Sequence, residues 1–179
     1  MVLSNADARE VGGEWPARGH AGRNPWTVQV LELSQEPLRT FAIVFDPGDE
    51  AIAGLAEAAR RLRLDAAHFT AIGAFERATI GWFDLEARDY RRNVVNEQVE
   101  VVSLVGDVTR ARPEGDELKI HGHAVLGRSD GTTLGGHLLE GFVRPTLEVV
   151  ITETPAELRR RHDPTTGLAL IDLDGSSGS

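Results

Sequence analysis

Residues 117–152 read ELKIHGHAVLGRSDGTTLGGHLLEGFVRPTLEVVIT, and this stretch decides the fold. Residues 117–127 and 137–152 are each rich in aliphatic and β-branched residues, which predicts β-strands. Glycine, serine and aspartate gather between these segments and predict a turn near residues 129–134. The stretch therefore predicts an antiparallel hairpin, and with it a sheet in which neighbouring strands run in opposite directions.

More strands are predicted on both sides of this hairpin. Before it, alternating or compact apolar runs rich in β-branched and aromatic residues indicate several strands. The third of these runs contains glycine near its middle, and we expect it to hold two strands that meet at residues 73–76. After the hairpin, LALIDL indicates a last edge strand. These runs span residues 26–33, 39–45, 68–84, 98–108 and 168–173.

One helix is predicted for residues 49–64, DEAIAGLAEAARRLRL. Acidic residues begin this segment and arginines end it, as the helix dipole favours. The segment PAELRRR, residues 155–161, is a candidate for a second short helix. Apolar side chains of the first helix recur on one face at helical spacing: Ile52, Leu55, Ala59 and Leu62.

Many strands at hairpin spacing, with one or two helices, predict an α+β domain. We expect a central, largely antiparallel β-sheet that is flanked by one or two helices. The chain has 179 residues, the length of one domain. We expect residues 1–25 to be a flexible N-terminal arm, residues 26–173 to form a single domain, and residues 174–179 to be a flexible tail.

The composition narrows the choice of function. The chain has no cysteine, which excludes disulfides, thiolate metal sites and thiol nucleophiles. No secretory signal pattern and no apolar run of about 20 residues occurs, so we expect a cytoplasmic protein without a membrane segment. The formal charge is −9, and Lys119 is the only lysine. Because nucleic-acid binding usually needs clustered basic residues, the charge argues against DNA as a partner.

Six motifs in order along residues 38–154 make the chain similar to the PPC domain, the "plants and prokaryotes conserved" family, in its free-standing prokaryotic form. The resemblance implies a central antiparallel sheet flanked by helices and assembly into a homotrimer. In plants the domain is attached to AT-hook segments that bind DNA, but this chain lacks the Arg-Gly-Arg-Pro core of such a hook. The motifs are FAIVFDPGDE, AIGAFERATIGWFD, VVSLVGDV, HGHAVLG, GGHLLEG and PTLEVVIT.

Three histidines of the hairpin form a candidate metal site. His121 and His123 are two residues apart, so their side chains point to the same face of a strand. A two-residue turn at Asp130-Gly131 would place residue 123 opposite residue 138, and His137 would then face the wrong way. A longer loop, or a bulge at Gly135-Gly136, would bring His137 beside His123.

Three imidazoles without cysteine suit Zn²⁺ or another borderline divalent ion and leave one position for water. The alternative is a set of strand histidines that bond to backbone or water. The resemblance favours the metal, because prokaryotic members with the HxH and GGH pattern look like metal binders and His121, His123 and His137 match that pattern. Glu140 and Glu148 lie near the hairpin and are candidates to orient a ligand or to act as a base beside bound water.

Three functions remain open at this point. The favoured one is a small trimeric metal-binding protein, with zinc as the expected cofactor and a small molecule as a candidate ligand. The second is a metal-dependent enzyme in which the ion lowers the pKa of bound water. The third is a DNA-associated regulatory protein, which is supported by the DNA-binding label that many prokaryotic members of the family carry and opposed by the negative charge.

Overall fold

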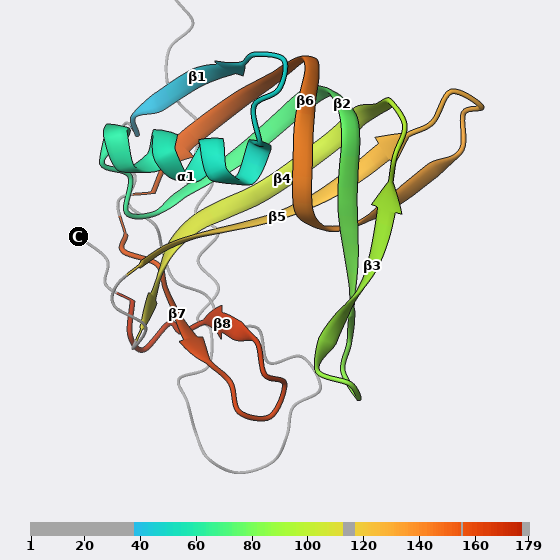
Figure 1. Ribbon diagram of the computed structural model, residues 1–179. Helices are drawn as coiled ribbons and strands as arrows, with labels where there is room; N and C mark the ends of the chain where they lie inside the picture. The colour runs from blue at the N-terminus through green and yellow to red at the C-terminus, as the bar shows by residue number, and fades with distance from the viewer. Residues whose placement is uncertain (1–37, 113–116, 155, 177–179) are drawn as a thin grey trace, which may run out of the picture. The chain divides into compact units, whose positions relative to one another are not determined.

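The computed structural model describes residues 38–112, 117–154 and 156–176, and within them it contains one α-helix and eight β-strands (Figure 1). All eight strands hydrogen-bond into one sheet. In chain order the elements are β1 (Thr40–Phe45), α1 (Ala51–Leu62), β2 (Ala67–Asp84), β3 (Asp89–Val95), β4 (Val99–Arg112), β5 (Glu117–Gly127), β6 (Thr133–Glu153), β7 (Arg159–His162) and β8 (Ala169–Ile171).

The sheet is built around two long strands, β2 and β6, which pair with each other along most of their length. The strand order is β3-β2-β6-β5-β4-β7-β8, while β1 also pairs with β6, and β2 also pairs with β4. Every pair is antiparallel except β4 with β7, which is parallel. The predicted largely antiparallel sheet is therefore confirmed.

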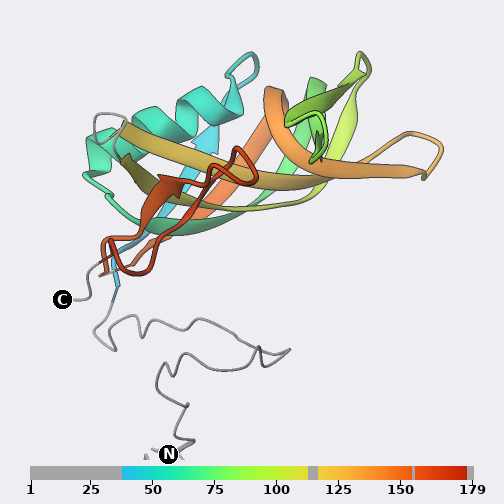
Figure 2. The same cartoon turned by 90° about the horizontal axis from the view of Figure 1, so that it is seen from below.

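Helix α1 confirms the helix predicted from the sequence. The Glu50 side chain caps its first turn by accepting hydrogen bonds from the backbone N–H groups of Ile52 and Ala53. Arg63 ends it in the left-handed conformation. Its buried face, which includes Leu55 at 0% exposure, packs on one side of the sheet. The hairpin of β7 and β8 lies across β4 and β5 from helix α1 (Figures 1 and 2).

Residues 68–84 form one strand rather than the two that we expected. β2 runs without a break from Ala67 to Asp84, and its pairing register shifts near Gly73. A side chain at Gly73 would collide with the backbone oxygen of Thr146, so glycine here permits a close approach of β6 and not a turn. Strand β3, which the sequence did not indicate, follows β2 because residues 85–88 form the actual turn.

The second helix expected at residues 155–161 is also wrong, because this segment leads into strand β7. Arg160 explains the difference. Its nearly buried guanidinium donates to the hydroxyl of Thr109 at 2.9 Å and to the carbonyl of Ala169 at 2.9 Å. These long-range bonds outweigh a weak local preference for helix. The predicted edge strand at residues 168–173 is confirmed as β8.

Two expectations lie outside the described residues, the flexible arm at residues 1–25 and the strand at residues 26–33. The expected tail at 174–179 is described only as far as residue 176. The helix in the described part of the chain is not long and apolar enough to cross a membrane.

Candidate metal centre

Strand β5 carries His121 and His123 on the sheet face that lies away from the core. Alternate residues of the same strand, Gly122, Ala124 and Leu126, are buried and face the core. On the neighbouring strand β4, Asp107 pairs with His121. The alternation predicted from the sequence therefore places both imidazoles on one surface.

Strand β6 adds the third imidazole, because His137 pairs directly with His123. The loop between the strands has five residues, 128–132, and the register then runs without a shift from Gly127↔Thr133 to His123↔His137. Of the two routes that the sequence left open, the longer loop is the one used, and no bulge interrupts this pairing at Gly135 or Gly136. A side chain at Gly136 would lie 2.6 Å from the carbonyl oxygen of Gly81 on β2.

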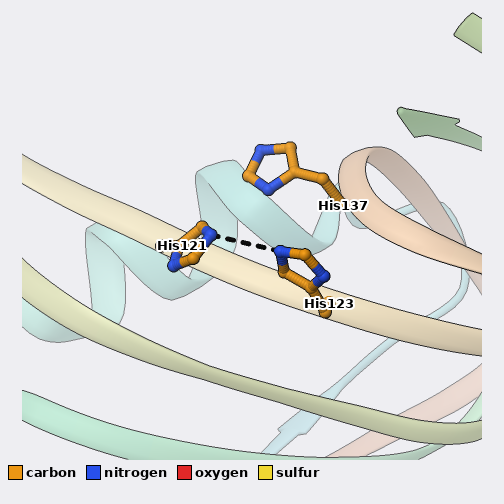
Figure 3. A group of neighbouring side chains, drawn as sticks. All are labelled: His121, His123 and His137. Carbon is orange, nitrogen blue, oxygen red and sulfur yellow. Dashed lines mark hydrogen bonds between the residues drawn. The ribbon is translucent and has the colours of Figure 1, made fainter. Parts of the chain in front are cut away.

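The three rings gather at one point above β5 (Figure 3). The Nε2 atoms of His121 and His123 are 3.2 Å apart. One nitrogen from each of the three residues lies within 4.8 Å of the other two. Two nitrogens bound to a tetrahedral zinc at about 2.0–2.1 Å are separated by about 3.3 Å, so the spacing of His121 and His123 fits a shared ion.

Asp107 and Arg160 lie beside Nδ1 of His121, the ring nitrogen that does not face His123. The Nδ1 atom of His121 lies 3.4 Å from the Asp107 carboxylate and 3.2 Å from the Arg160 Nη2. Arg160 also donates to both oxygens of Asp107 at 2.9 Å. Burial alone would raise the pKa of Asp107, but hydrogen bonds from His121 and Arg160 lower that pKa below its usual range. Asp107 is therefore ionised, and it can accept a hydrogen bond from Nδ1 of His121 when that nitrogen carries the ring proton.

His137 is the most enclosed of the three imidazoles. Tyr90 stacks on its ring with centroids 4.9 Å apart and an angle of 20° between the planes. Its Nδ1 atom is buried and has no hydrogen-bond partner among the described residues. Burial, followed by the nearby charges of His121, His123 and Arg160, lowers the pKa of His137 to about 4. His137 is therefore neutral near pH 7 and keeps a free lone pair, as a metal ligand requires.

The pKa of His123 is also lowered, first by burial and then by the charge of His121. The histidines open into a pocket of about 540 Å³ that strands β2, β3, β5, β6 and β7 and residues 168–170 enclose. Its lining includes Trp82, Phe83, Tyr90 and Leu170. A partly buried imidazole cluster that lines such a pocket can hold an ion and leave one side of it open to a ligand.

The two glutamates singled out in the sequence do not join this cluster in the structure. Glu140 pairs with Thr79 on β2, whose hydroxyl lies 3.3 Å from its carboxylate. Glu148 lines a separate depression beside Ile72 and Gly73. The carboxylate beside the histidines is Asp107.

Sequence reasoning missed three residues of the site, namely Asp107, Arg160 and Tyr90. Asp107 has a signal, because it interrupts the apolar run VVSLVGDV within a predicted strand. Arg160 and Tyr90 have none, since they reach the histidines from segments whose strands were not predicted.

Comparison with known proteins finds a matching family and similar solved structures. Residues 32–155 match the Plants and Prokaryotes Conserved (PCC) domain. A metal-containing protein from Archaeoglobus fulgidus shares 31% identity with a TM-score of 0.73, covering 81% of this chain and 99% of that one. A plant- and prokaryote-conserved (PPC) protein from Pyrococcus horikoshii shares 26% identity with a TM-score of 0.71, covering 79% and 97%.

A protein from Ralstonia eutropha, which its name calls DNA-binding only provisionally, shares 26% identity with a TM-score of 0.68, covering 74% of this chain and 90% of that one. Among curated proteins, the chain is 29% identical to the bifunctional protein GlmU of Synechococcus over 177 residues, which is 97% of this chain. It spans 26% of the length of that relative. The likeness to the longer protein is thus a likeness to one part of it.

Proposed function

This chain belongs to the Plants and Prokaryotes Conserved domain family, and we propose that it binds one divalent metal ion, zinc by preference, through His121, His123 and His137. The observation that carries the proposal is the unpartnered, buried Nδ1 of His137 beside two imidazole nitrogens only 3.2 Å apart. Buried polar atoms are nearly always bonded, so a ring left unbonded among other imidazoles indicates a missing partner. A cation satisfies it.

The residues around the cluster suit a nitrogen-ligated ion. The lowered pKa values of His123 and His137 keep both rings neutral, so their lone pairs are free near pH 7. When the Nδ1–H group of His121 donates a hydrogen bond to Asp107, the lone pair of the ring lies on Nε2 and faces His123. A carboxylate that fixes the tautomer in this way is a common partner of metal-binding histidine. The bound ion would supply an open coordination position to the pocket.

The likeness to the archaeal metal-containing protein adds independent support. Zinc is the preferred candidate because three imidazoles with one open position are a common zinc set, and because the chain has no thiolate to attract softer metals.

The test is metal analysis of protein purified without chelator or nickel resin, compared with its His123→Ala variant. We expect about one zinc per chain in the parent and a loss of at least about a hundredfold in affinity in the variant, because two imidazoles hold zinc weakly. His68→Ala is the matched control, since His68 is an exposed histidine on β2. Unchanged zinc binding in His123→Ala would show that the three histidines are not its ligands.

We also propose that the protein assembles as a homotrimer through the open face of its sheet. Cross-strand pairs place four large apolar residues on this face, the one opposite α1. Apolar patches of this kind mark contact surfaces. The residues and their exposures are Val44 (66%), Ile72 (60%), Val105 (49%) and Val150 (51%).

Light scattering tests the assembly. We expect a mass near three times 19.4 kDa for the parent. Ile72→Lys places a charge on the apolar face and should shift the mass towards the monomer, because an unpaired buried charge is costly. Val94→Lys is the control, since Val94 is equally exposed but lies on β3. A parent that is monomeric at micromolar concentration would contradict the proposal.

A further inference from the structure

The pocket above the histidines has apolar walls, whereas the histidines at its base are polar. Its volume of about 540 Å³ is in the range of small-molecule sites. On one side, the hairpin of β2 and β3 contributes Trp82, Phe83 and Tyr90; on the other, Leu168 and Leu170 come from β8 and the residue before it. A ligand that reaches the base therefore lies between aromatic and aliphatic side chains.

The base of the pocket attracts negative charge. Among the described residues that line the pocket, none is aspartate or glutamate, whereas Lys119 and Arg160 both line it. The charge of Arg160 is offset by Asp107, to which it is bonded. Among the described residues, the ion-pair partner of Lys119 is Glu117, at 3.1 Å on an exposed surface, and such pairs are weak. Lys119 lies two residues before His121 on the same face of β5, so its ammonium group can turn towards an anion at the histidines.

The protein ligands of the proposed ion do not balance its positive charge. Three neutral imidazoles leave the two positive charges of a divalent ion unbalanced. Together with Lys119, the ion makes the base of the pocket strongly positive, and a neutral ligand would leave this charge without compensation in a partly dehydrated site. An anionic oxygen in the open coordination position would balance it.

From these observations we infer that the pocket binds a small organic carboxylate with an apolar tail. The carboxylate bonds to the ion and faces Lys119, while the tail lies between Phe83, Tyr90 and Leu170. This inference rests on the proposed function, because the carboxylate needs the ion held by the histidines. It goes further by naming the chemical class of the ligand.

Calorimetric titration of zinc-loaded protein with acetate, butanoate, hexanoate and hexanamide tests the inference. Affinity should rise from acetate to hexanoate by up to about fourfold for each methylene that becomes buried. Hexanamide has the same tail without the charge, and it should bind at least about tenfold more weakly than hexanoate. Equal affinity for hexanoate and hexanamide, or for hexanoate and acetate, would overturn the inference.

Two variants separate the head of the ligand from its tail. Lys119→Met should weaken acetate and hexanoate alike, by up to about fivefold. Leu170→Ala should weaken hexanoate by about fivefold and leave acetate unchanged, because only the longer tail reaches the wall. Arg61→Met and Leu85→Ala are the controls, since both residues are exposed and neither lines the pocket. An effect of the controls as large as that of the variants would also refute the inference.

The zinc content of each sample distinguishes this inference from the proposed function. A protein that takes up no zinc refutes both. A protein that holds one zinc per chain but binds hexanoate no better than hexanamide refutes the carboxylate ligand and leaves the metal site intact. Chelator-treated protein should lose hexanoate binding, and binding that is equally tight without zinc would show that the ion takes no part.

Discussion

Asp107→Asn is expected to weaken zinc binding although Asp107 is not itself a ligand. The carboxylate lies 3.4 Å from Nδ1 of His121, and both of its oxygens accept hydrogen bonds from Arg160 at 2.9 Å. An asparagine amide keeps the shape of the side chain but removes its negative charge. The imidazole is then less firmly fixed as the Nδ1–H tautomer, and the Arg160 Nη2, 3.2 Å away, is free to donate to Nδ1 instead.

The magnitude follows from this competition between tautomers. If Nδ1 of His121 accepts a proton from Arg160, the ring proton sits on Nε2 and that nitrogen cannot bind the ion. Loss of a carboxylate behind a metal-binding histidine usually lowers metal affinity about 10- to 100-fold, or roughly 1.4 to 2.8 kcal/mol. We expect a change in this range because Asp107 is partly buried, with 24% of its side chain exposed, and its charge is little screened.

Competition with a chelator of known zinc affinity measures the change, and circular dichroism of the metal-free proteins checks the fold. Glu153→Gln is the matched control, because the Glu153 side chain is 25% exposed and is also bonded by an arginine, Arg39, at 2.6 Å. It lies at the far end of β6 from His137. If Asp107→Asn binds zinc as tightly as the parent, or if Glu153→Gln weakens it equally, Asp107 does not orient His121.

Two further outcomes are expected. Protons compete with zinc for imidazole nitrogens, so zinc affinity falls as the pH falls. Because the pKa of His137 is about 4 and that of His123 is lowered, a titration between pH 6.5 and 5 should show a shallower loss of zinc affinity than three imidazoles with the ordinary pKa of about 6.5 would give. Because this chain has a formal charge of −9, it should bind duplex DNA weakly and lose affinity steeply with salt, as fluorescence anisotropy would show. Submicromolar and sequence-selective binding at physiological salt would instead favour the DNA-associated function that the sequence left open.

Strongly periodic segments predicted the fold, and weakly periodic ones did not. Helix α1 and strands β5 and β6 have apolar residues at clear intervals, and all three were predicted correctly. Strand β3 was missed because most of its residues are exposed, so burial leaves no alternation in its sequence. Strand β7 was mistaken for a helix because its shape depends on contacts of Arg160 with distant residues. The family resemblance indicated by the six motifs is confirmed.

The candidate site also has a part that the sequence predicted and a part that it did not. The neighbourhood of His121 and His123 follows from strand geometry alone, and the structure has it as expected. The other residues of the site, Asp107, Tyr90 and Arg160, come from β4, β3 and β7, and their positions depend on strand pairings that no local pattern specifies. Glu140 and Glu148 were chosen because they are close to the histidines in sequence. Closeness in sequence is a poor guide on long strands, which carry neighbouring residues far from one another.

The position of His137 shows how the core, rather than the turn, determines the site. Asp130-Gly131 is a strong signal for a two-residue turn, which would pair His123 with Leu138. That register would turn Leu138, now 2% exposed, away from the core and bring His137 into it. Exposing one leucine costs about 1.5 to 3 kcal/mol, and burying an unbonded imidazole costs more. The five-residue loop keeps Leu138 in the core, and the same register places His137 opposite His123 on the outer face, where a bound ion could satisfy its buried Nδ1.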